Sequence, residues 1–167
     1  SRGLGDVYKR QVLLAEPIAE QLAPVAQAIG LHQTAQWSLM TYMPQSTRAA
    51  NRQYRYELIN CAAHLEIANQ VVADAFGVAF TSLNRAFGPG TLQAPGLDIF
   101  LSRQNGRVLS SLRTTRAGDI IGIWAMATAP AHQQQGVGRA LLEYVLAYHH
   151  DRGGNLFYLL ATDAGKR

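Results

Sequence analysis

Two glycines separated by one residue, Gly136 and Gly138, lie at the start of a stretch in which apolar residues recur at helical spacing. The first turn of any helix has backbone N–H groups without intrahelical partners, and together they carry about half a positive charge. Glycines remove the side chains that would keep an anion away from this backbone. The pattern therefore predicts a cradle for a phosphate or diphosphate at a helix N-terminus.

The residues that follow these glycines exclude two common phosphate-binding motifs. A P-loop needs a Lys followed by Ser or Thr after the second glycine, whereas Arg139 and Ala140 follow Gly138. A dinucleotide-binding fingerprint needs a third glycine near the position of Leu141. The cradle is therefore expected to serve a different phosphate-bearing ligand.

Carboxylates and histidines elsewhere do not identify a general base. Asp98 and Asp119 lie beside expected strand starts, where a carboxylate is usually a solvated turn residue. His132 lies in the loop before the cradle and is expected at its rim. The consecutive residues His149 and His150 cannot face each other on a helix, and we expect both in a solvated last turn.

No metal site is predicted. Cys61 and His64 could share a helix face, but two ligands do not complete a zinc site. Cys61 is the only cysteine, so no internal disulfide can form. This cysteine content favours a reducing, cytoplasmic compartment.

The cradle needs a strand before it and a crossover helix after it. The nearly all-apolar run 120–128 predicts a central strand that ends before Pro130. In residues 136–150 the apolar positions form one helical stripe, and residues 156–161 predict a last buried strand. A crossover helix usually joins parallel strands, so this pair is expected to be parallel.

An antiparallel meander is expected before the central strand. Residues 97–102 and 107–114 are strand-like and flank Asn105-Gly106, the strongest short signal for a tight hairpin. Residues 54–58 alternate between apolar and polar, which is typical of a half-buried strand. The fold class is therefore α/β (α+β), with a mixed, mostly antiparallel central sheet flanked by helices.

Helices are expected between the first strand of this meander and the hairpin. Asn60 is suited to cap a helix that Gly77 ends, with its apolar positions on one face. Residues 80–87 predict a short helix. Residues 88–96 are expected to be a loop, because proline and glycine recur there too often for regular structure.

The domain organisation follows from these patterns. Residues 1–11 are interpreted as a non-native tail, because positions 6–11 resemble the translation of a sequencing adaptor. Residues 12–44 predict a helix ending at Gly30 and a strand near 37–43, interpreted as the remnant of an upstream unit. Residues 45–52 form a polar linker, and 53–167 are the main domain.

Composition excludes some partners. The net charge of +4 is spread along the chain, without the basic and aromatic clustering typical of nucleic-acid binders. No run approaches the roughly eighteen apolar residues that a membrane span needs. Neither nucleic acid nor a membrane is therefore expected as a partner.

The cradle resembles the coenzyme A motif of the GCN5-related N-acetyltransferase (GNAT) superfamily, which is Gln or Arg, two residues, Gly, one residue, and Gly or Ala. Gln133, Gly136 and Gly138 occupy these positions. The resemblance extends over residues 53–167 and includes the order of the expected elements. It implies the acyl-CoA N-acyltransferase fold, C-terminally truncated, without its last helix and strands.

The resemblance implies roles for individual residues. Backbone groups of Met126, Ala127 and Thr128 would pair with the pantetheine arm, and Gln133 would lie beside the diphosphate. Backbone amides would hold the diphosphate at Gln134, Gln135, Gly136, Val137, Gly138, Arg139 and Ala140. The strands that carry Thr128 and Leu160 would separate to admit the thioester. The family's usual proton donor, a tyrosine, would lie beyond Arg167, so the chain as given is expected to be inactive.

The implied activity is transfer of an acetyl group from acetyl-CoA to a primary amine of a small molecule or peptide, by direct attack in a ternary complex. Trp124 would then be a core residue or a wall of the acceptor pocket, and core is favoured. A homodimer is compatible with this interpretation. A non-catalytic acyl-CoA-binding regulatory module is the alternative, and a nucleotide-binding protein is a third class.

Overall fold

The computed structural model describes residues 16–33 and 37–161. The chain divides into two compact units, Ser1–Gln36 and Trp37–Arg167. The expected tail over residues 1–11 lies outside the described residues. Among the described helices, none combines the length and apolar composition that crossing a membrane requires.

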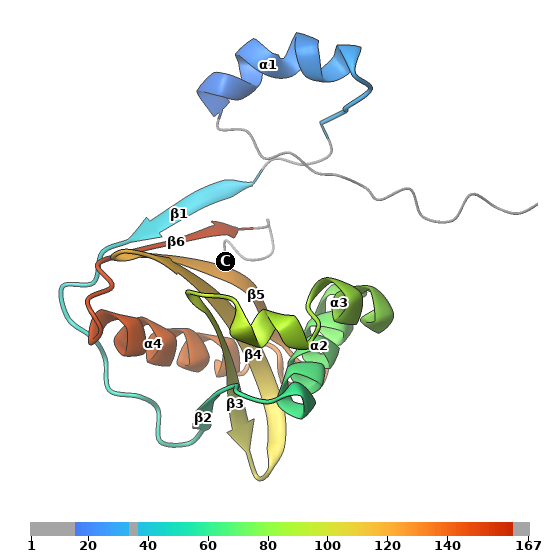
Figure 1. Cartoon of the computed structure of the whole chain (residues 1–167). Coiled ribbons are helices and arrows are strands. Elements are labelled where there is room, and N and C mark those ends of the chain that lie inside the picture. Colours follow the sequence, from blue (N-terminus) through green and yellow to red (C-terminus); the bar gives the residue numbers. More distant parts are fainter. Residues whose placement is uncertain (1–15, 34–36, 162–167) are drawn as a thin grey trace, which may run out of the picture. The chain divides into compact units, whose positions relative to one another are not determined.

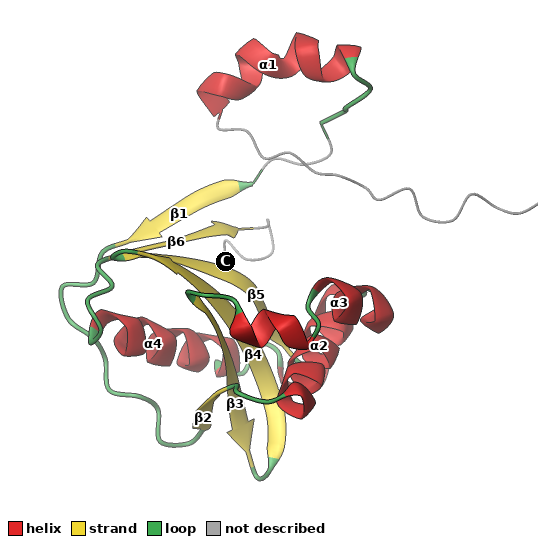
Figure 2. Cartoon of the chain, viewed as in Figure 1, coloured by secondary structure: helices red, strands yellow, loops and turns green. Residues whose placement is uncertain are grey.

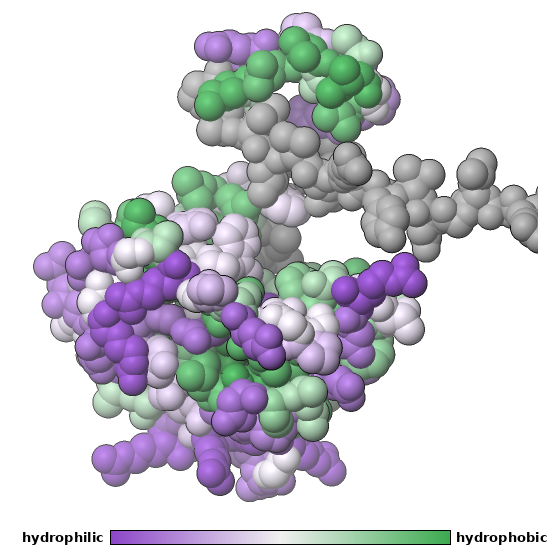
Figure 3. Space-filling view, in the orientation of Figure 1, coloured by the Kyte–Doolittle hydropathy of each residue, from purple (hydrophilic) through white to green (hydrophobic). Residues whose placement is uncertain are grey.

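The first unit contains one described helix, α1 (Glu16–Ala28). The expected start of this helix at residue 12 lies outside the described part. Gly30 adopts a φ of 80°, and its amide bonds to the carbonyl of Gln27, so glycine ends the helix as predicted. Ile18, Leu22 and Val25 are all exposed on α1, and Figure 3 shows a hydrophobic band along it.

The second unit is built on a six-stranded mixed sheet in the order β1-β6-β5-β4-β3-β2, drawn in yellow in Figure 2. The strands are β1 (Ser38–Tyr42), β2 (Arg55–Leu58), β3 (Leu97–Gln104), β4 (Arg107–Ala117), β5 (Ile120–Thr128) and β6 (Leu156–Ala161). Only β5 and β6 are parallel, and the other neighbouring strands are antiparallel. The predicted mixed, mostly antiparallel sheet is confirmed.

Strand β1 differs from the expected domain organisation. It pairs antiparallel with β6, from Ser38 opposite Ala161 to Tyr42 opposite Phe157. It is therefore an edge strand of the main sheet and not part of a separate upstream unit. The division between compact units falls before Trp37, because β1 pairs with β6, and the local sequence does not indicate this pairing.

Helices cover both faces of the sheet, as Figure 1 shows. The helix α4 (Val137–His150) packs against β3, β4 and β5, and α2 (Ala62–Phe76) packs against these three strands from the other side. The core on the α4 face consists of Phe100, Leu112, Ile121, Ile123, Leu141, Val145 and Phe157. The apolar stripe predicted for α4 supplies part of this core.

The helices on the α2 face correct two local predictions. Asn60 does not cap α2, because Cys61 occupies the N-cap position and makes no side-chain capping bond. Gly77 ends α2 with a φ of 64°, as predicted. A short helix, α3 (Phe80–Ala86), follows as expected, but the expected loop contains the 3-10 helix η1 (Pro89–Gln93). Proline at the first position of η1 is compatible with a helix start, where no amide donor is needed.

The hairpin between β3 and β4 forms as predicted. Asn105 and Gly106 have φ values of 51° and 78°, the positive values that a two-residue type I′ turn requires. Both strands run further than the sequence indicated, to Gln104 and Ala117. The long β4 therefore reaches across the sheet and contributes polar residues to both faces.

Candidate functional site

The parallel strands β5 and β6 separate at their carboxyl ends. Their pairing begins at Ile120 opposite Leu156 and stops at Ile123 opposite Leu159. Strand β5 nevertheless continues to Thr128 and β6 to Ala161. From Trp124 onward, the edge of β5 that faces β6 therefore has no strand partner among the described residues.

A bulge marks the point of separation. The pairing of β4 with β5 changes register between Ser111, which lies opposite Ala127, and Arg113, which lies opposite Trp124. Ala125, in the bulge, has a φ of 44°, which is uncommon for a residue with a side chain. Strain of this kind persists only when the surroundings enforce it, and it occurs often at functional sites.

The cradle lies directly after β5. The 3-10 helix η2 (Pro130–His132) leads into a turn in which Gln134 and Gly136 have φ values of 59° and 79°. The first amide to bond within α4 is that of Ala140, which donates to the carbonyl of Gly136 at 2.9 Å. The amides of the preceding three helical residues make no backbone hydrogen bond within the described chain. They provide the anion-binding group that the sequence predicted.

Two glutamine side chains brace this turn. Gln133 donates through Nε2 to the carbonyl of Thr128 at 3.1 Å, and Gln135 donates to the carbonyl of Ala131 at 3.1 Å. Both donors bond backbone carbonyls of the segment that enters the cradle. The turn is thus fixed relative to the end of β5 before any ligand is present, which reduces the entropy lost on binding.

Glycine is needed at positions 136 and 138 for different structural reasons. A Cβ atom on Gly138 would come within 2.9 Å of Thr128 Oγ1 and 3.2 Å of Met126 Cε. A Cβ atom on Gly136 would meet nothing within 4 Å, but the positive φ disfavours other residues there. Gly138 therefore permits close packing of α4 on β5, whereas Gly136 permits the turn and leaves its outer side open.

All residues predicted to bind the cofactor lie on the continuous segment from the end of β5 to the first turn of α4. Their exposure divides them by role. Ala127, Val137 and Ala140 are buried and anchor the segment, while Met126, Thr128 and Gly138 are half-buried. The exposed members are Gln133, Gln134, Gln135, Gly136 and Arg139. A diphosphate could approach from this exposed side, and His132 lies half-buried at the rim.

A polar and aromatic cluster lies on the sheet next to the bulge. Trp124 donates through Nε1 to Thr115 Oγ1 at 2.8 Å, and its ring meets that of Tyr158 edge-on at 5.7 Å. Gly122 lies below them, because a Cβ there would come within 2.8 Å of all three polar tips. We call Thr115, Trp124 and Tyr158 the aromatic floor. Trp124 is half-buried, so it is less enclosed than the favoured core interpretation implied.

Neither Thr115 nor Tyr158 was predicted from the sequence as a site residue. Thr115 lies opposite Gly122 on β5, and Gly122 lies opposite Tyr158 on β6. This row across three strands could have been found only by fixing the register of both ladders. The glycine inside an otherwise bulky apolar strand was the one local signal, because such a glycine often marks a close approach of other groups.

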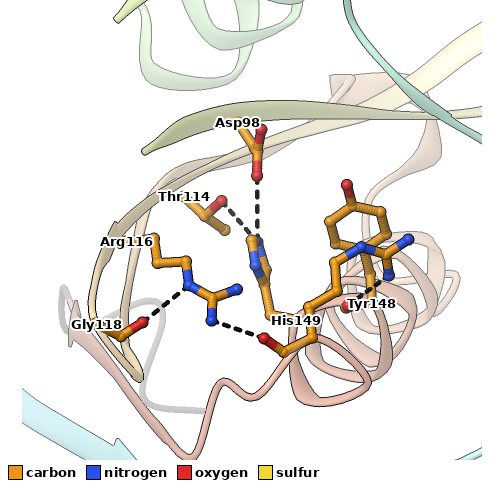
Figure 4. A network of polar contacts seen from close by, with 7 residues as sticks. Asp98, Thr114, Arg116, Gly118, Tyr148 and His149 are labelled. Carbon is orange, nitrogen blue, oxygen red and sulfur yellow. Dashed lines mark hydrogen bonds and ion pairs between the residues drawn. The ribbon is translucent and has the colours of Figure 1, made fainter. Parts of the chain in front are cut away.

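His149 corrects the expectation of a solvated helix end. It is 1% exposed, and its Nε2 lies 2.9 Å from Thr114 Oγ1 and 4.0 Å from Asp98 Oδ2. Figure 4 shows the Thr114 and Asp98 side chains pointing toward the His149 ring. Burial lowers the pKa of His149 and outweighs the opposing effect of Asp98. Because α4 begins at the cradle, its last turn lies at the opposite end, so this network is not part of the candidate site.

The remaining sequence candidates stay apart from the cradle. Asp119 is exposed in the turn before β5, as expected. Cys61 is exposed, and His64 forms an ion-pair contact with Glu57. Within the described residues, no three His, Cys, Asp or Glu side chains are grouped to bind a metal ion.

Comparisons with known proteins agree with this geometry. The model of the acetyltransferase (GNAT) family matches residues 66–166. No match is found among curated proteins. A solved GCN5-related N-acetyltransferase from Kribbella flavida is similar over 85% of this chain and 54% of its own, with 21% identity and a TM-score of 0.63. The chain therefore spans about half the length of that protein.

Two further solved structures share the fold. An aminoglycoside acetyltransferase from an uncultured soil metagenomic sample has 18% identity and a TM-score of 0.59, over 68% of this chain and 82% of its own. A predicted acetyltransferase with acetyl-CoA from Clostridium acetobutylicum has 14% identity and a TM-score of 0.55, over 68% of this chain and 84% of its own. The separated strands, the cradle after β5 and the family match lead to one conclusion: this chain belongs to the acetyltransferase (GNAT) family.

Proposed function

We propose that the chain is an N-acetyltransferase that transfers the acetyl group of acetyl-CoA to a primary amine of a small molecule or peptide. The observation that carries this proposal is the continuity between the unpaired edge of β5 and the free amides of α4. The first suits an extended amide-bearing arm, and the second suits a diphosphate. Coenzyme A contains these two groups in this order from its thiol end.

Individual residues have defined tasks in this proposal. The backbone of Met126, Ala127 and Thr128 pairs with the pantetheine arm in the place of a sheet neighbour. The amides of Val137, Gly138 and Arg139 donate to the diphosphate, and each charge-assisted bond of this type typically contributes about 1.5–3 kcal/mol. Gln133 and Gln135 keep the turn in shape through their bonds to backbone carbonyls.

The proposed reaction is a direct attack within a ternary complex. The amine nitrogen forms a bond to the thioester carbonyl carbon, the carbon–sulfur bond breaks, and the sulfur leaves as a thiolate that takes up a proton. The amine must first lose its own extra proton, which costs about 4–5 kcal/mol at pH 7 for a lysine-like amine. The separation of β5 from β6 provides the passage between thioester and acceptor.

A small-molecule acceptor has support from the fold neighbours, because one of them is an aminoglycoside acetyltransferase. The aromatic floor is our proposed acceptor surface. Trp124 and Tyr158 offer apolar rings with polar tips beside the bulge, where the thioester is expected. Such surfaces bind amines by stacking and by cation–π contact before the amine is deprotonated.

Calorimetry with coenzyme A tests the cradle. We expect Gln134→Glu to weaken coenzyme A binding about fivefold to thirtyfold, or about 1–2 kcal/mol, because it adds a carboxylate beside the diphosphate. Gln134 is exposed, so the same backbone should be retained. Gln53→Glu, also at an exposed position, is the matched control and should bind as the wild type does.

The alternatives give different results in the same set of assays. If wild-type protein shows no heat with coenzyme A, the cradle assignment is wrong. Thermal protection by ATP without protection by coenzyme A would identify a nucleotide-binding protein. Binding by a full-length version without release of free thiol from acetyl-CoA, across a panel of amines, would favour the regulatory module over the enzyme.

A further inference from the structure

Arg113 on β4 is a buried cation that the proposed chemistry does not yet use. Its side chain is 1% exposed, and its guanidinium lies 4.0 Å from the centre of the Phe87 ring. Nη2 donates to Asn69 Oδ1 on α2. Asn69 in turn donates to Asn84 Oδ1 at 2.5 Å and to the Phe87 carbonyl at 3.1 Å. The partners that Arg113 has in the described part of the chain are therefore all uncharged.

The guanidinium has spare capacity for an anion. Nε and Nη1 are buried and make no hydrogen bond to any described part of the protein. No carboxylate forms an ion pair with Arg113 within the described residues. Burial lowers its pKa to about 10, so the group keeps its charge at neutral pH. A buried cation without a counter-charge is unfavourable, and a carboxylate that accepts two of its N–H groups would relieve this cost.

The position of Arg113 connects it to the aromatic floor. Arg113 lies directly opposite Trp124 in the β4–β5 ladder, and Thr115 lies two residues further along β4. Residues opposite each other in an antiparallel pair, and residues two apart on a strand, project from the same face. Arg113 therefore lies beside Trp124 and Thr115 of the aromatic floor, on the face of the sheet that α2 and α3 cover.

The cover above Arg113 is held by few buried contacts. Phe87 directly follows α3, and neither α3 nor η1 contains a fully buried residue. In contrast, α2 buries Leu65, Ala68 and Val72 against the sheet. Segments with few buried side chains open at low free-energy cost compared with global unfolding. The segment from Phe80 to Gln93 is accordingly the part of this face that can move to expose the guanidinium.

We infer that the acceptor amine carries a carboxylate, and that this carboxylate accepts an unused N–H of the Arg113 guanidinium when Phe87 moves aside. The inference rests on the proposed acetyltransferase function. It assigns Arg113 as the residue that selects the acceptor, because it would hold the carboxylate while the amine lies over the aromatic floor near the thioester. Amino acids and their short derivatives are the matching chemical class.

A small carboxylate tests the site without knowledge of the acceptor. The thermal midpoint of the full chain is measured in acetate and in chloride at equal ionic strength. We expect acetate to raise the midpoint of the wild type by about 2–4 °C relative to chloride. Phe87→Ala should increase this response, and Arg113→Met should remove it. Arg107→Met, the same change at an exposed position of the same strand, should keep the wild-type response.

Two outcomes of that measurement overturn the inference. One is an acetate response in Arg113→Met equal to that of the wild type, and the other is no acetate response in the wild type. If Arg113→Met does not fold, Arg113→Lys replaces it, and the response should then be reduced. Coenzyme A calorimetry is independent of this result, so loss of the proposed function and loss of the carboxylate site are distinguished.

Acetylation assays provide the second readout. Matched pairs of free amino acids and their carboxamides are supplied as acceptors with acetyl-CoA to a full-length version of the protein. We expect kcat/KM to favour the free amino acid about tenfold to a hundredfold in the wild type. Arg113→Met should abolish this preference and leave KM for acetyl-CoA unchanged. Equal use of both acceptors by an active wild type would contradict the inference.

Discussion

The two ends of α4 differ in whether their terminal backbone groups are hydrogen-bonded within the protein. At the first turn, the amides of Val137, Gly138 and Arg139 have no backbone partner among the residues that the structure describes. At the last turn, Arg152 donates to the Tyr148 carbonyl at 2.8 Å, and the Gly154 amide donates to the His149 carbonyl at 2.8 Å. One end of the helix is open and the other is closed by the protein itself.

The side chains around the two ends repeat this difference. The open end has a turn braced by glutamines and a glycine that faces free space. At the closed end, Arg116 donates to the carbonyls of Gly118 and Arg152, and His149 is buried against Thr114. A ligand needs donors that the protein has not used, whereas stability needs donors that are satisfied. The comparison suggests that binding and stability can be changed separately in this helix.

The largest expected effect comes from removing a buried side chain at the closed end of α4. His149→Ala should lower the free energy of unfolding by about 2–4 kcal/mol, because it leaves a cavity and an unpaired Thr114 hydroxyl. The affinity for coenzyme A should not change. Urea denaturation and calorimetry measure the two quantities. His150→Ala is the neighbouring control, with an expected loss of about 1 kcal/mol or less. An equal loss of unfolding free energy in both variants would contradict the conclusion that His149, and not His150, stabilises this end of the helix.

A pair of glycine substitutions compares the two ends directly. Gly136 and Gly153 have φ values of 79° and 83°, so an alanine at either position should cost about 1–2 kcal/mol of unfolding free energy. Only Gly136→Ala should also weaken coenzyme A binding, because its Cβ lies at the turn that holds the free amides. Denaturation curves and calorimetry on both variants test this. A similar loss of affinity in Gly153→Ala would show that the effect is not local to the cradle.

The smallest effect is a pH dependence that belongs to the closed end. Because burial lowers the pKa of His149, the unfolded chain binds its proton more readily than the folded chain does. The stability contribution is therefore complete above the ordinary pKa of 6.5 and is lost as the pH falls below it. We expect the free energy of unfolding to decrease between pH 6.5 and 5.5. Denaturation across this range should show a smaller decrease in His149→Gln.

The elements whose signals are local could be predicted from the sequence. Asn105-Gly106 determines its hairpin through its own backbone preferences, and the stripe on α4 follows from helical spacing. The family resemblance came from the same kind of short-range pattern, and the family match confirms it. The roles of the cradle residues in binding coenzyme A stay predictions.

Features that depend on distant partners could not be predicted. The burial of His149 is set by Asp98 and Thr114, which reach it from two strands of the meander. Arg113 is buried because Asn69 and Phe87 close over it from segments that precede the hairpin. Arginine is mostly exposed in folded proteins and histidine is only intermediate, so residue type alone does not predict the full burial of either side chain. Pairing of β1 with β6 is nonlocal in the same sense, so the domain boundary was placed too late in the chain.

The antiparallel pairing of β1 with β6 also limits the order in which the chain can fold during synthesis. Strand β1 is among the first described segments to be translated, and β6 is the last. At a translation rate of about 5–20 residues per second, β6 is made on the order of ten seconds after β1. Throughout that interval Leu39 and Met40 belong to an unpaired apolar strand without a charged residue, a type of segment that aggregates readily. Completion of the sheet edge is therefore a late event, and nascent chains should need protection from one another until β6 has been made.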